Sequence, residues 1–469
     1  MKELKINKFL ISSIWYLFAI VGGYSIAFIG NIIFTHIMTT NEYGMYTTYY
    51  SIVSLAGPFI CGNLFVGLQN GYFDFKENRK NYRASVFFLS FIIFCITSLL
   101  SVFICFSLNK LFSFNKSLIF LFIALLHSYL FFIINYYNTY ENLEGKFKTR
   151  SLLIFLQNVL PVFLSILLIL LIGKNGYFER IIGSITPLFI ISIFLILFIL
   201  KGRNKLINKN YFSYALKISI PSVLGSISSL IMSNADNIMI TSMVNAEATA
   251  VYGFMYNIGN VLVVLLSAVE ASVSAWIYNA LDTNRTSAAK SGQKWYFAFF
   301  ILIISLLLMI FPEFIKFFTP SEYWDFRYIS PFVFSCSLSV VNTLHCNIIN
   351  FNKKTGQVSF CVLVSAILNV LLNYIFIKKF GSVAAAYTSL ICTLLQTILL
   401  RIVLKKICAN IFSDLYSLLY ILFIMILCLV FSFTYNNVLI RYAVYSSIIL
   451  ILGILILMNK EKLRELIKR

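Results

Sequence analysis

Apolar runs of about 20 residues recur along the whole chain and alternate with short polar segments. A run of this length is what one α-helix needs to cross a bilayer. The connecting segments are short, and the longest of them cover about 201–215 and 279–294. We therefore predict about fourteen membrane-spanning helices: 12–35, 45–70, 84–108, 117–137, 151–172, 181–200, 216–239, 250–276, 295–318, 328–350, 358–377, 382–402, 414–434 and 438–458.

Composition agrees with an all-α, polytopic membrane protein. Of 469 residues 60% are hydrophobic and only 12% are charged, whereas soluble domains are near a quarter charged. The first run follows a basic start, is longer than a signal-peptide core and lacks an Ala-x-Ala site, so we expect it to be an uncleaved span. The loops leave no room for a soluble domain between spans.

The basic residues predict the orientation of the chain. With the N-terminus in the cytoplasm, 28 of the 37 Lys and Arg fall on the cytoplasmic side and nine on the outer side. This asymmetry follows the positive-inside rule, and an even number of spans places both termini in the cytoplasm. Anionic lipid headgroups account for the net charge of +20. Because the cations are dispersed, nucleic acid is not an expected partner.

Cysteine and histidine give no sign of a metal or redox site. The nine cysteines are scattered through apolar stretches without a C-x-x-C pair, as small core residues would be. His36, His127 and His345 have no ligand spacing. No metal or other cofactor is predicted.

Two landmarks suggest an internal duplication. Gly145 with Asn158 recurs 211 positions later, and the pair Tyr43-Gly44 recurs 209 positions later. Parallel repeats of this kind are common in secondary transporters. We predict a six-helix lobe over 1–205, a second over 206–405, and two additional helices with a basic cytoplasmic tail over 406–469.

The span 216–239 carries the clearest polar pattern. Six residues follow one another at steps of three and four, which places them on one helix face. Small residues also let membrane helices pack closely, so packing and the lining of a cavity both remain open. The six are Ser219, Ser222, Ser226, Ser229, Ser233 and Asp236.

Polar residues also gather in three other spans. Ionisable or amide side chains inside a membrane are costly and usually face water or a partner. Adding these positions gives our candidates for a substrate cavity: Asn31, Asn63, Asn70, Ser229, Ser233, Asn234, Asp236, Asn237, Tyr256, Asn257, Asn260 and Glu270.

Asp236 and Glu270 do not form a predicted pair. Each lies roughly 12 Å from the bilayer midplane, on opposite sides, at 1.5 Å per residue. A paired-carboxylate enzyme is therefore disfavoured. Asp236 is either a helix-end anchor or part of the cavity, and Glu270 either binds an inner-loop cation or lines the cavity. Both are candidates for coupling transport to protons or sodium.

Several stretches resemble the Wzx-type polysaccharide flippases of the multidrug/oligosaccharidyl-lipid/polysaccharide (MOP) exporter superfamily. The resemblance covers nearly the whole chain in the right order and is weak residue by residue. It rests on "THIMTTNEYGMYTTYYSI", "IPSVLGSISSLIMSNADNIMI", "AEATAVYGFMYNIG" and "FGSVAAAYTSLI".

This resemblance implies a fold and a function. Two parallel six-helix lobes would form a V, with spans one, two, seven and eight lining a cavity that opens alternately to each side. The substrate would be an undecaprenyl-pyrophosphate-linked oligosaccharide for O-antigen or capsule, moved across the bacterial cytoplasmic membrane. Membrane lipids, a polymerase and a chain-length regulator are the implied partners. Asp236 and Pro221 match the family's acidic position and proline in span seven.

One departure concerns the pyrophosphate. Related lipid II flippases carry several cavity arginines, whereas the first eight spans here hold no clearly central Lys or Arg. Our candidates for this group are Lys217, Arg150 and Arg401; a lysine at the membrane interface can equally extend to the headgroups.

Two rival functions remain. A drug or cation antiporter of the same superfamily predicts a tight cluster of carboxylates, and only two separated ones are found. A membrane-embedded polymerase or acyltransferase predicts a large outer loop or a His/Arg constellation, and the sequence shows neither. We therefore expect a transporter rather than an enzyme.

Overall fold

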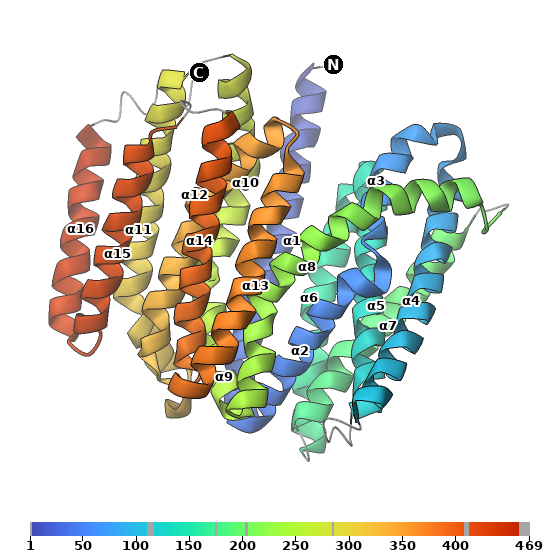
Figure 1. Ribbon diagram of the computed structural model, residues 1–469, viewed down its shortest axis with the longest axis horizontal. Coiled ribbons are helices and arrows are strands. Elements are labelled where there is room, and N and C mark those ends of the chain that lie inside the picture. Colours follow the sequence, from blue (N-terminus) through green and yellow to red (C-terminus); the bar gives the residue numbers. More distant parts are fainter. Residues whose placement is uncertain are drawn as a thin grey trace. The chain divides into compact units, whose positions relative to one another are not determined.

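The structure is a computed structural model that describes residues 2–109, 117–173, 176–201, 205–283, 286–407 and 412–458. The described residues form sixteen α-helices and short 3₁₀ turns, without a strand (Figure 1). The helices divide into two compact units, Met1–Thr241 and Ser242–Arg469.

The first unit contains eight helices. Most of them are apolar along their full length. Their bounds are α1 Lys2–Ile37, α2 Thr40–Cys61, α3 Leu64–Asp74, α4 Arg79–Asn109, α5 Ser117–Leu143, α6 Phe147–Ile172, α7 Gly176–Leu200 and α8 Lys209–Met243, whose last two residues fall in the second unit.

The second unit contains the remaining helices. Two 3₁₀ turns, Ser321–Tyr323 and Phe326–Tyr328, precede its central helix. The bounds are α9 Ala246–Gly259, α10 Val261–Asp282, α11 Thr286–Phe318, α12 Ile329–Phe351, α13 Thr355–Phe380, α14 Val383–Ile407, α15 Asp414–Thr434 and α16 Val438–Met458.

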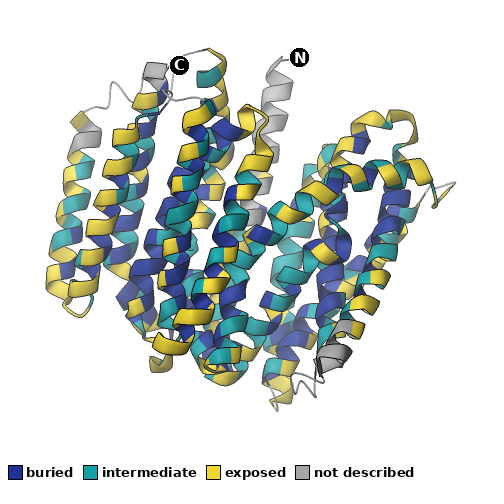
Figure 2. Cartoon of the chain, in the orientation of Figure 1, coloured by how far each residue is buried: buried dark blue, intermediate teal, exposed yellow. Residues whose placement is uncertain are grey.

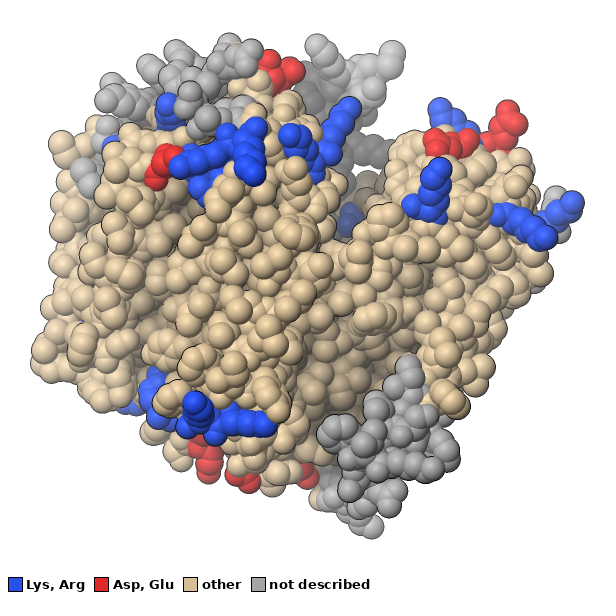
Figure 3. Space-filling view, viewed as in Figure 1, with Lys and Arg blue, Asp and Glu red and all other residues tan. Residues whose placement is uncertain are grey.

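All fourteen predicted spans lie on helices, so the predicted fold class is confirmed. Eleven helices of the described residues are long and apolar enough to cross a membrane, and a bent pair makes twelve. Two shorter apolar helices, Val21–Ile37 and Val438–Ile454, coincide with the first and last predicted spans. Among the described residues of each unit, Lys, Arg, Asp and Glu gather near the helix ends in this view, with uncharged surface between (Figure 3).

The predicted span 45–70 is not one straight helix but the pair α2–α3, bent by 41°. Gly62 and Asn63 both adopt left-handed backbone conformations, with φ of 54° and 51°. Glycine takes this conformation at no steric cost, and asparagine takes it more readily than most residues. Two such residues in succession end α2 and restart the chain as α3 in a new direction.

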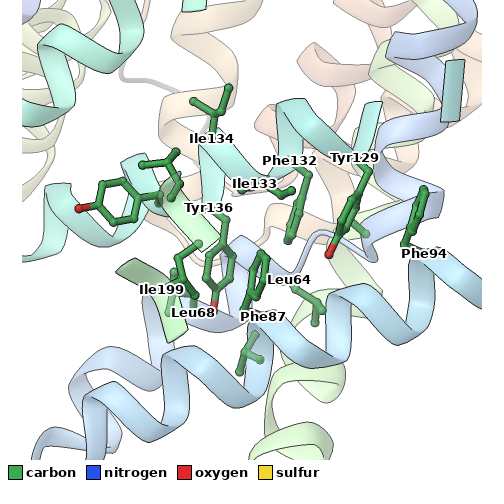
Figure 4. Close-up of a cluster of buried hydrophobic side chains, with 14 of the residues drawn as sticks. Leu64, Leu68, Phe87, Phe94, Tyr129, Phe132, Ile133, Ile134, Tyr136 and Ile199 are labelled. Carbon is green, nitrogen blue, oxygen red and sulfur yellow. The ribbon is translucent and has the colours of Figure 1, made fainter. Parts of the chain in front are cut away.

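The core of the first unit lies among α3, α4, α5 and α7. Leu64 and Leu68 of α3 meet Phe87 of α4 and Tyr136 of α5 in a cluster of buried side chains (Figure 4). The buried faces of these helices point toward one another, while their opposite faces remain exposed (Figure 2). This pattern suits helices whose outer faces contact lipid.

Close contact between α6 and α7 depends on a glycine. A methyl group at Gly183 would lie 2.4 Å from the Cα of Ser165, a separation that real Cβ atoms do not show. Ser165 in turn donates its hydroxyl to the carbonyl of Arg180 at 3.1 Å. Small residues of this kind let the backbones of membrane helices approach each other.

Arg83 of α4 directly precedes the predicted span 84–108 and is buried inside the first unit. Its guanidinium donates to the carbonyls of Phe198 and Ile199 at 2.9–3.2 Å and lies over the ring of Tyr140. The last carbonyls of a helix have no partner within the helix. Arg83 therefore caps the C-terminal end of α7.

In the second unit α12 is the central helix. It packs against α9, α10, α11, α13, α14 and α15. Most of its residues are therefore buried. In Figure 1 α11, α15 and α16 lie side by side at one edge of this unit. Arg441 of α16 is fully buried there, paired with Glu313 of α11, and it donates to the carbonyl of Met309 at 3.1 Å.

The partners of equivalent helices are similar in the two units. By the predicted duplication α5 corresponds to α12, and each is the helix about which its unit is packed. Likewise, α6 packs on α7 as α13 packs on α14. A duplication predicts this arrangement. The lobe boundary predicted after residue 205 stays a prediction; the contacts within the chain divide it after Thr241, at the end of α8 and not before this helix.

Candidate functional site

The serine face of α8 meets the bend between α2 and α3. Asn63, the second residue of the bend, is buried, and its amide group donates to three acceptors on α8. These are the carbonyl and hydroxyl oxygens of Ser222 at 3.2 and 3.4 Å and the hydroxyl of Ser226 at 2.7 Å. The predicted candidate Asn63 thus holds two helices together.

One turn further along α3, the contact with α8 is closer still. The backbone N–H of Gly67 donates to the hydroxyl of Ser219 at 3.0 Å. A methyl group on Gly67 would lie 2.9 Å from that hydroxyl and 3.0 Å from the backbone of Ala215. The first three serines of the predicted face, Ser219, Ser222 and Ser226, therefore serve helix packing.

The other end of α8 makes a second set of contacts. Asn237 donates to the hydroxyl of Ser51 at 2.9 Å, and the hydroxyls of Thr48 and Thr241 lie 2.5 Å apart. Asp236 is buried beside them, with 3% of its surface exposed. A buried carboxylate must be compensated by charge or hydrogen bonds. Asp236 therefore stands in a contact region rather than on an open helix end.

Between these two sets of contacts, α8 presents open polar groups. Ser229 is exposed, and its hydroxyl donates to the carbonyl of Gly225 in its own helix. Ser233 and Asn234 are half-buried; Ser233 donates to Ser229, and Asn234 donates to Leu230 and to Ser233. Each of these groups keeps further lone pairs or protons with which it can bind a ligand.

Asn31 of α1 binds a buried arginine that directly precedes the predicted span 181–200. The guanidinium of Arg180 donates to the Asn31 side-chain oxygen at 3.0 Å. It lies 3.8 Å above the ring of Phe34 and 3.9 Å above that of Tyr46. Arg180 is one of nine Lys and Arg residues on the predicted outer side, so the charge bias alone does not single it out.

Asn70 and Lys217 are the exposed candidates at the other end of α8. Gly67 of α3 contacts Ser219 of α8, and Tyr214 of α8 donates a short hydrogen bond to Asp74 of α3. Asn70 and Lys217 lie between these two contacts, one on each helix. Asn70 donates only to a carbonyl of its own helix, that of Val66. An ammonium and an amide are thus accessible on neighbouring helices.

The other two cationic candidates have partners near their own helices. Arg401 of α14 forms an ion pair with Asp414 of α15, so its charge is already compensated. Arg150 of α6 donates to the side-chain oxygen of Asn142 at 2.6 Å. Neither observation tests a role in binding pyrophosphate, which stays a prediction for both.

The remaining candidates lie in the second unit. Tyr256 of α9 stacks on Tyr252 with ring centroids 6.4 Å apart, while Asn257 is half-buried on the same helix. Asn260 occupies the short break between α9 and α10, where its backbone N–H donates to the carbonyls of Tyr256 and Ile258. The span 250–276 nevertheless remains one continuous membrane segment over most of its length.

Glu270 of α10 is exposed in the second unit. The ion pairs found among the described residues do not include it, and both predicted alternatives, an inner-loop cation and the cavity, stay predictions. Its predicted role in ion coupling stays a prediction, as does that of Asp236. Within the described ranges, no three His, Cys, Asp or Glu residues come together as metal ligands.

The architecture is shared with membrane transporters of known structure. The fold is similar to a structure of the lipid II flippase MurJ in an inward closed conformation, with a TM-score of 0.68 and 16% sequence identity. The similarity covers 97% of this chain and 100% of the MurJ chain. The fold is also similar to a multidrug resistance MATE transporter of the MOP superfamily in an inward-facing conformation. There the TM-score is 0.62 and the identity 15%, over 82% of this chain and 96% of the other.

Family models identify the chain more narrowly. The model described as "Polysaccharide biosynthesis protein" matches residues 9–277, more than half of the chain, and the MatE model matches residues 221–375. The chain belongs to the polysaccharide biosynthesis protein family. No curated protein matches it in sequence. The similar structures are those of a flippase and a transporter, so the chain has a fold that such proteins share, and its apolar helices make it a multi-pass membrane protein.

Proposed function

We propose that this protein is a flippase for undecaprenyl-pyrophosphate-linked oligosaccharide repeat units. It would move them from the cytoplasmic to the outer face of the bacterial cytoplasmic membrane for O-antigen or capsule synthesis, with both of its termini in the cytoplasm. The family match and the similarity to a lipid II flippase support this class of substrate. A polymerase and a chain-length regulator would act on the exported units.

The observation that carries the proposal is the open polar stretch of α8. Ser229, Ser233 and Asn234 satisfy their hydrogen bonds within their own helix and still leave donors and acceptors accessible. A helix in contact with lipid gains nothing from such groups, because lipid tails offer no partner. Sugar hydroxyls offer such partners, because they both donate and accept hydrogen bonds.

The charged end of the substrate would bind near one end of this stretch. Lys217 is exposed on α8, two residues before the packed Ser219, and Asn70 is exposed on α3. A lysine ammonium binds phosphate as a point charge, and an amide N–H adds a hydrogen bond. Both residues lie toward the predicted cytoplasmic side, where the substrate is made.

Loss of the chain in its native host tests the proposal. Cells without it should accumulate lipid-linked repeat units and lose surface polysaccharide, and the wild-type gene should restore both. The variant Ser229→Ala/Ser233→Ala/Asn234→Leu should restore far less. As a matched control, Ser446→Ala/Ser447→Ala changes two α16 serines that also bond their own helix. Normal surface polysaccharide without the chain would contradict the proposal.

The MatE match supports a second candidate, a cation-coupled drug antiporter. The matched region contains both Asp236 and Glu270. This function predicts drug sensitivity in cells without the chain and unchanged levels of lipid-linked oligosaccharide. Asp236→Asn and Glu270→Gln would then abolish drug efflux. Drug sensitivity and the level of lipid-linked oligosaccharide can both be measured in the strains that lack the chain.

A further inference from the structure

The end of α5 carries a polar face outside the cavity candidates predicted from the sequence. Four polar side chains follow one another at positions i, i+3, i+4 and i+7, which places them on one side of the helix. They are Asn135, Asn138, Thr139 and Asn142, and we call them the α5 polar face. Asn135 and Asn142 are exposed, Thr139 is half-buried and Asn138 is buried. All four lie in the half of α5 nearer the predicted cytoplasmic side.

The bend between α2 and α3 leaves this face uncovered. Before the bend, α2 packs on the same side of α5, where the ring centroids of Tyr50 and Phe131 lie 6.2 Å apart. Phe131 precedes Asn135 by one helical turn, so both lie on that side. After the bend, α3 packs on another side of α5, with the ring centroids of Tyr72 and Tyr140 6.0 Å apart. Tyr140 follows Asn135 by five residues, a rotation of about 140° around the helix.

The side chain of Asn138 is the part of this face that points to a ligand. Only 6% of its surface is exposed, and among the described residues neither its side-chain nitrogen nor its oxygen has a hydrogen-bond partner. A buried polar group left unpaired is costly, and a carboxamide has both donors and an acceptor. The neighbouring Thr139 donates its hydroxyl to the carbonyl of Asn135 at 2.8 Å. The Asn138 carboxamide therefore matches a group that accepts and donates, as a hydroxyl does.

A guanidinium lies at the last residue of the face. Arg150 of α6 donates to the side-chain oxygen of Asn142 at 2.6 Å. Asn142 follows Asn138 by four residues, roughly 6 Å along the helix, so one molecule can reach both. The buried carboxylate nearby, that of Glu141, pairs with Lys146 at 3.2 Å. A guanidinium binds phosphate oxygens through parallel hydrogen bonds. The face thus offers amides for hydroxyl groups and, beside them, a cation for a phosphate.

We propose that the α5 polar face and Arg150 form a binding site for a phosphate ester that carries hydroxyl groups. The hydroxyls bond to the amides of Asn138 and Asn135, and the phosphate binds Arg150. Two kinds of molecule have this chemistry: the headgroup of phosphatidylglycerol and the sugar–pyrophosphate end of a lipid-linked oligosaccharide. The second source rests on the proposed function, whereas the first does not.

Binding to the purified full-length chain in detergent tests the site. Calorimetry measures the Kd of short-chain phosphatidylglycerol and of an undecaprenyl-pyrophosphate-linked oligosaccharide. We expect Asn138→Leu and Arg150→Met each to weaken binding of one of these probes at least tenfold, and the probe affected identifies the source. Short-chain phosphatidylcholine, whose headgroup has a phosphate but no hydroxyl, should bind at least tenfold more weakly than that probe.

Two variants of the second unit are matched controls. Asn342 of α12 is also a buried asparagine, and its side-chain oxygen has no partner among the described residues. Arg327 forms an ion pair with Asp325 at 2.7 Å. Asn342→Leu and Arg327→Met should leave the Kd of both probes unchanged, because neither residue belongs to the α5 site.

Three outcomes would overturn the proposal: a Kd for both probes that neither site variant changes, an equal loss in the control variants, or equal binding of phosphatidylcholine. Asn138→Leu should melt no lower than wild type without a probe, because it removes an unpaired buried group. Should it fold poorly, Asn135→Leu changes an exposed residue, and an unchanged Kd there contradicts the site. A chain that binds phosphatidylglycerol here and does not move the oligosaccharide would contradict the proposed function alone.

Discussion

Asn63 combines two requirements that few residues meet. Its backbone is left-handed, which costs most L-residues roughly 1–2 kcal/mol, and its amide donates to both Ser222 and Ser226. Asparagine tolerates this conformation and supplies the donor. The bend in the second span and the attachment of α8 therefore depend on the same side chain.

Two substitutions separate these contributions. Asn63→Gly keeps the backbone conformation and removes the hydrogen bonds, so we expect a loss of about 1–3 kcal/mol, because the buried acceptors on α8 lose their donor. Asn63→Ala should lose about 1–2 kcal/mol more. Thermal unfolding of the purified protein in detergent measures both. Equal melting of the two variants would show that the left-handed conformation carries no cost.

At the scale of helices, small residues and buried ion pairs hold the elements together. Gly183→Ala should separate α6 from α7, because the added methyl would meet the Ser165 backbone. We expect a loss of about 1–3 kcal/mol in stability. The control is Gly22→Ala in α1, where the nearest atoms, on Phe155, lie 3.6 Å away. If both variants unfold like wild type, the glycine is not needed for the approach of α6 and α7.

The pair of α11 and α16 offers a further prediction. Arg441→Met would leave Glu313 without its cation and free the carbonyls that Arg441 now binds. Breaking a partly buried ion pair on one side costs about 3–5 kcal/mol. The double variant Arg441→Met/Glu313→Leu should recover much of this loss. Limited proteolysis of the C-terminal helices checks the result, and no difference between single and double variants would contradict it.

The helices could be predicted from the sequence, but the neighbours of their polar faces could not. Hydropathy predicts each span because lipid selects long apolar runs. Periodicity placed Ser219 and Ser229 on one face of α8, yet one packs against Gly67 and the other is exposed. The bend at Asn63 was also missed, since its apolar flanks look like one continuous helix.

Buried cations were missed for a related reason. Arg180 stands directly before the predicted span 181–200, where hydropathy assigns it to a loop, and Arg441 lies in the first turn of the predicted span 438–458. In the structure each is buried, and the guanidinium of Arg180 lies against the rings of Phe34 and Tyr46. Such contacts depend on rings from other helices, which no local pattern in the sequence reveals.

At the scale of the whole molecule, each unit packs its helices about one central helix, α5 or α12. The first unit also holds α8, whose polar face is closed by contacts at both ends and open between them. A transporter needs groups that can bind a polar cargo and contacts that can be released. The first unit carries accessible polar groups on α8, between the contacts of that helix with α3 and with α2.

Transport in reconstituted vesicles tests the central claim most directly. The purified protein is placed in vesicles with a fluorescent undecaprenyl-pyrophosphate-linked oligosaccharide, and an impermeant reagent then quenches only the outer leaflet. We predict that wild type and Ser446→Ala/Ser447→Ala make the inner pool accessible, whereas Ser229→Ala/Ser233→Ala/Asn234→Leu does so at least tenfold more slowly. Movement no faster than in protein-free vesicles would contradict the account.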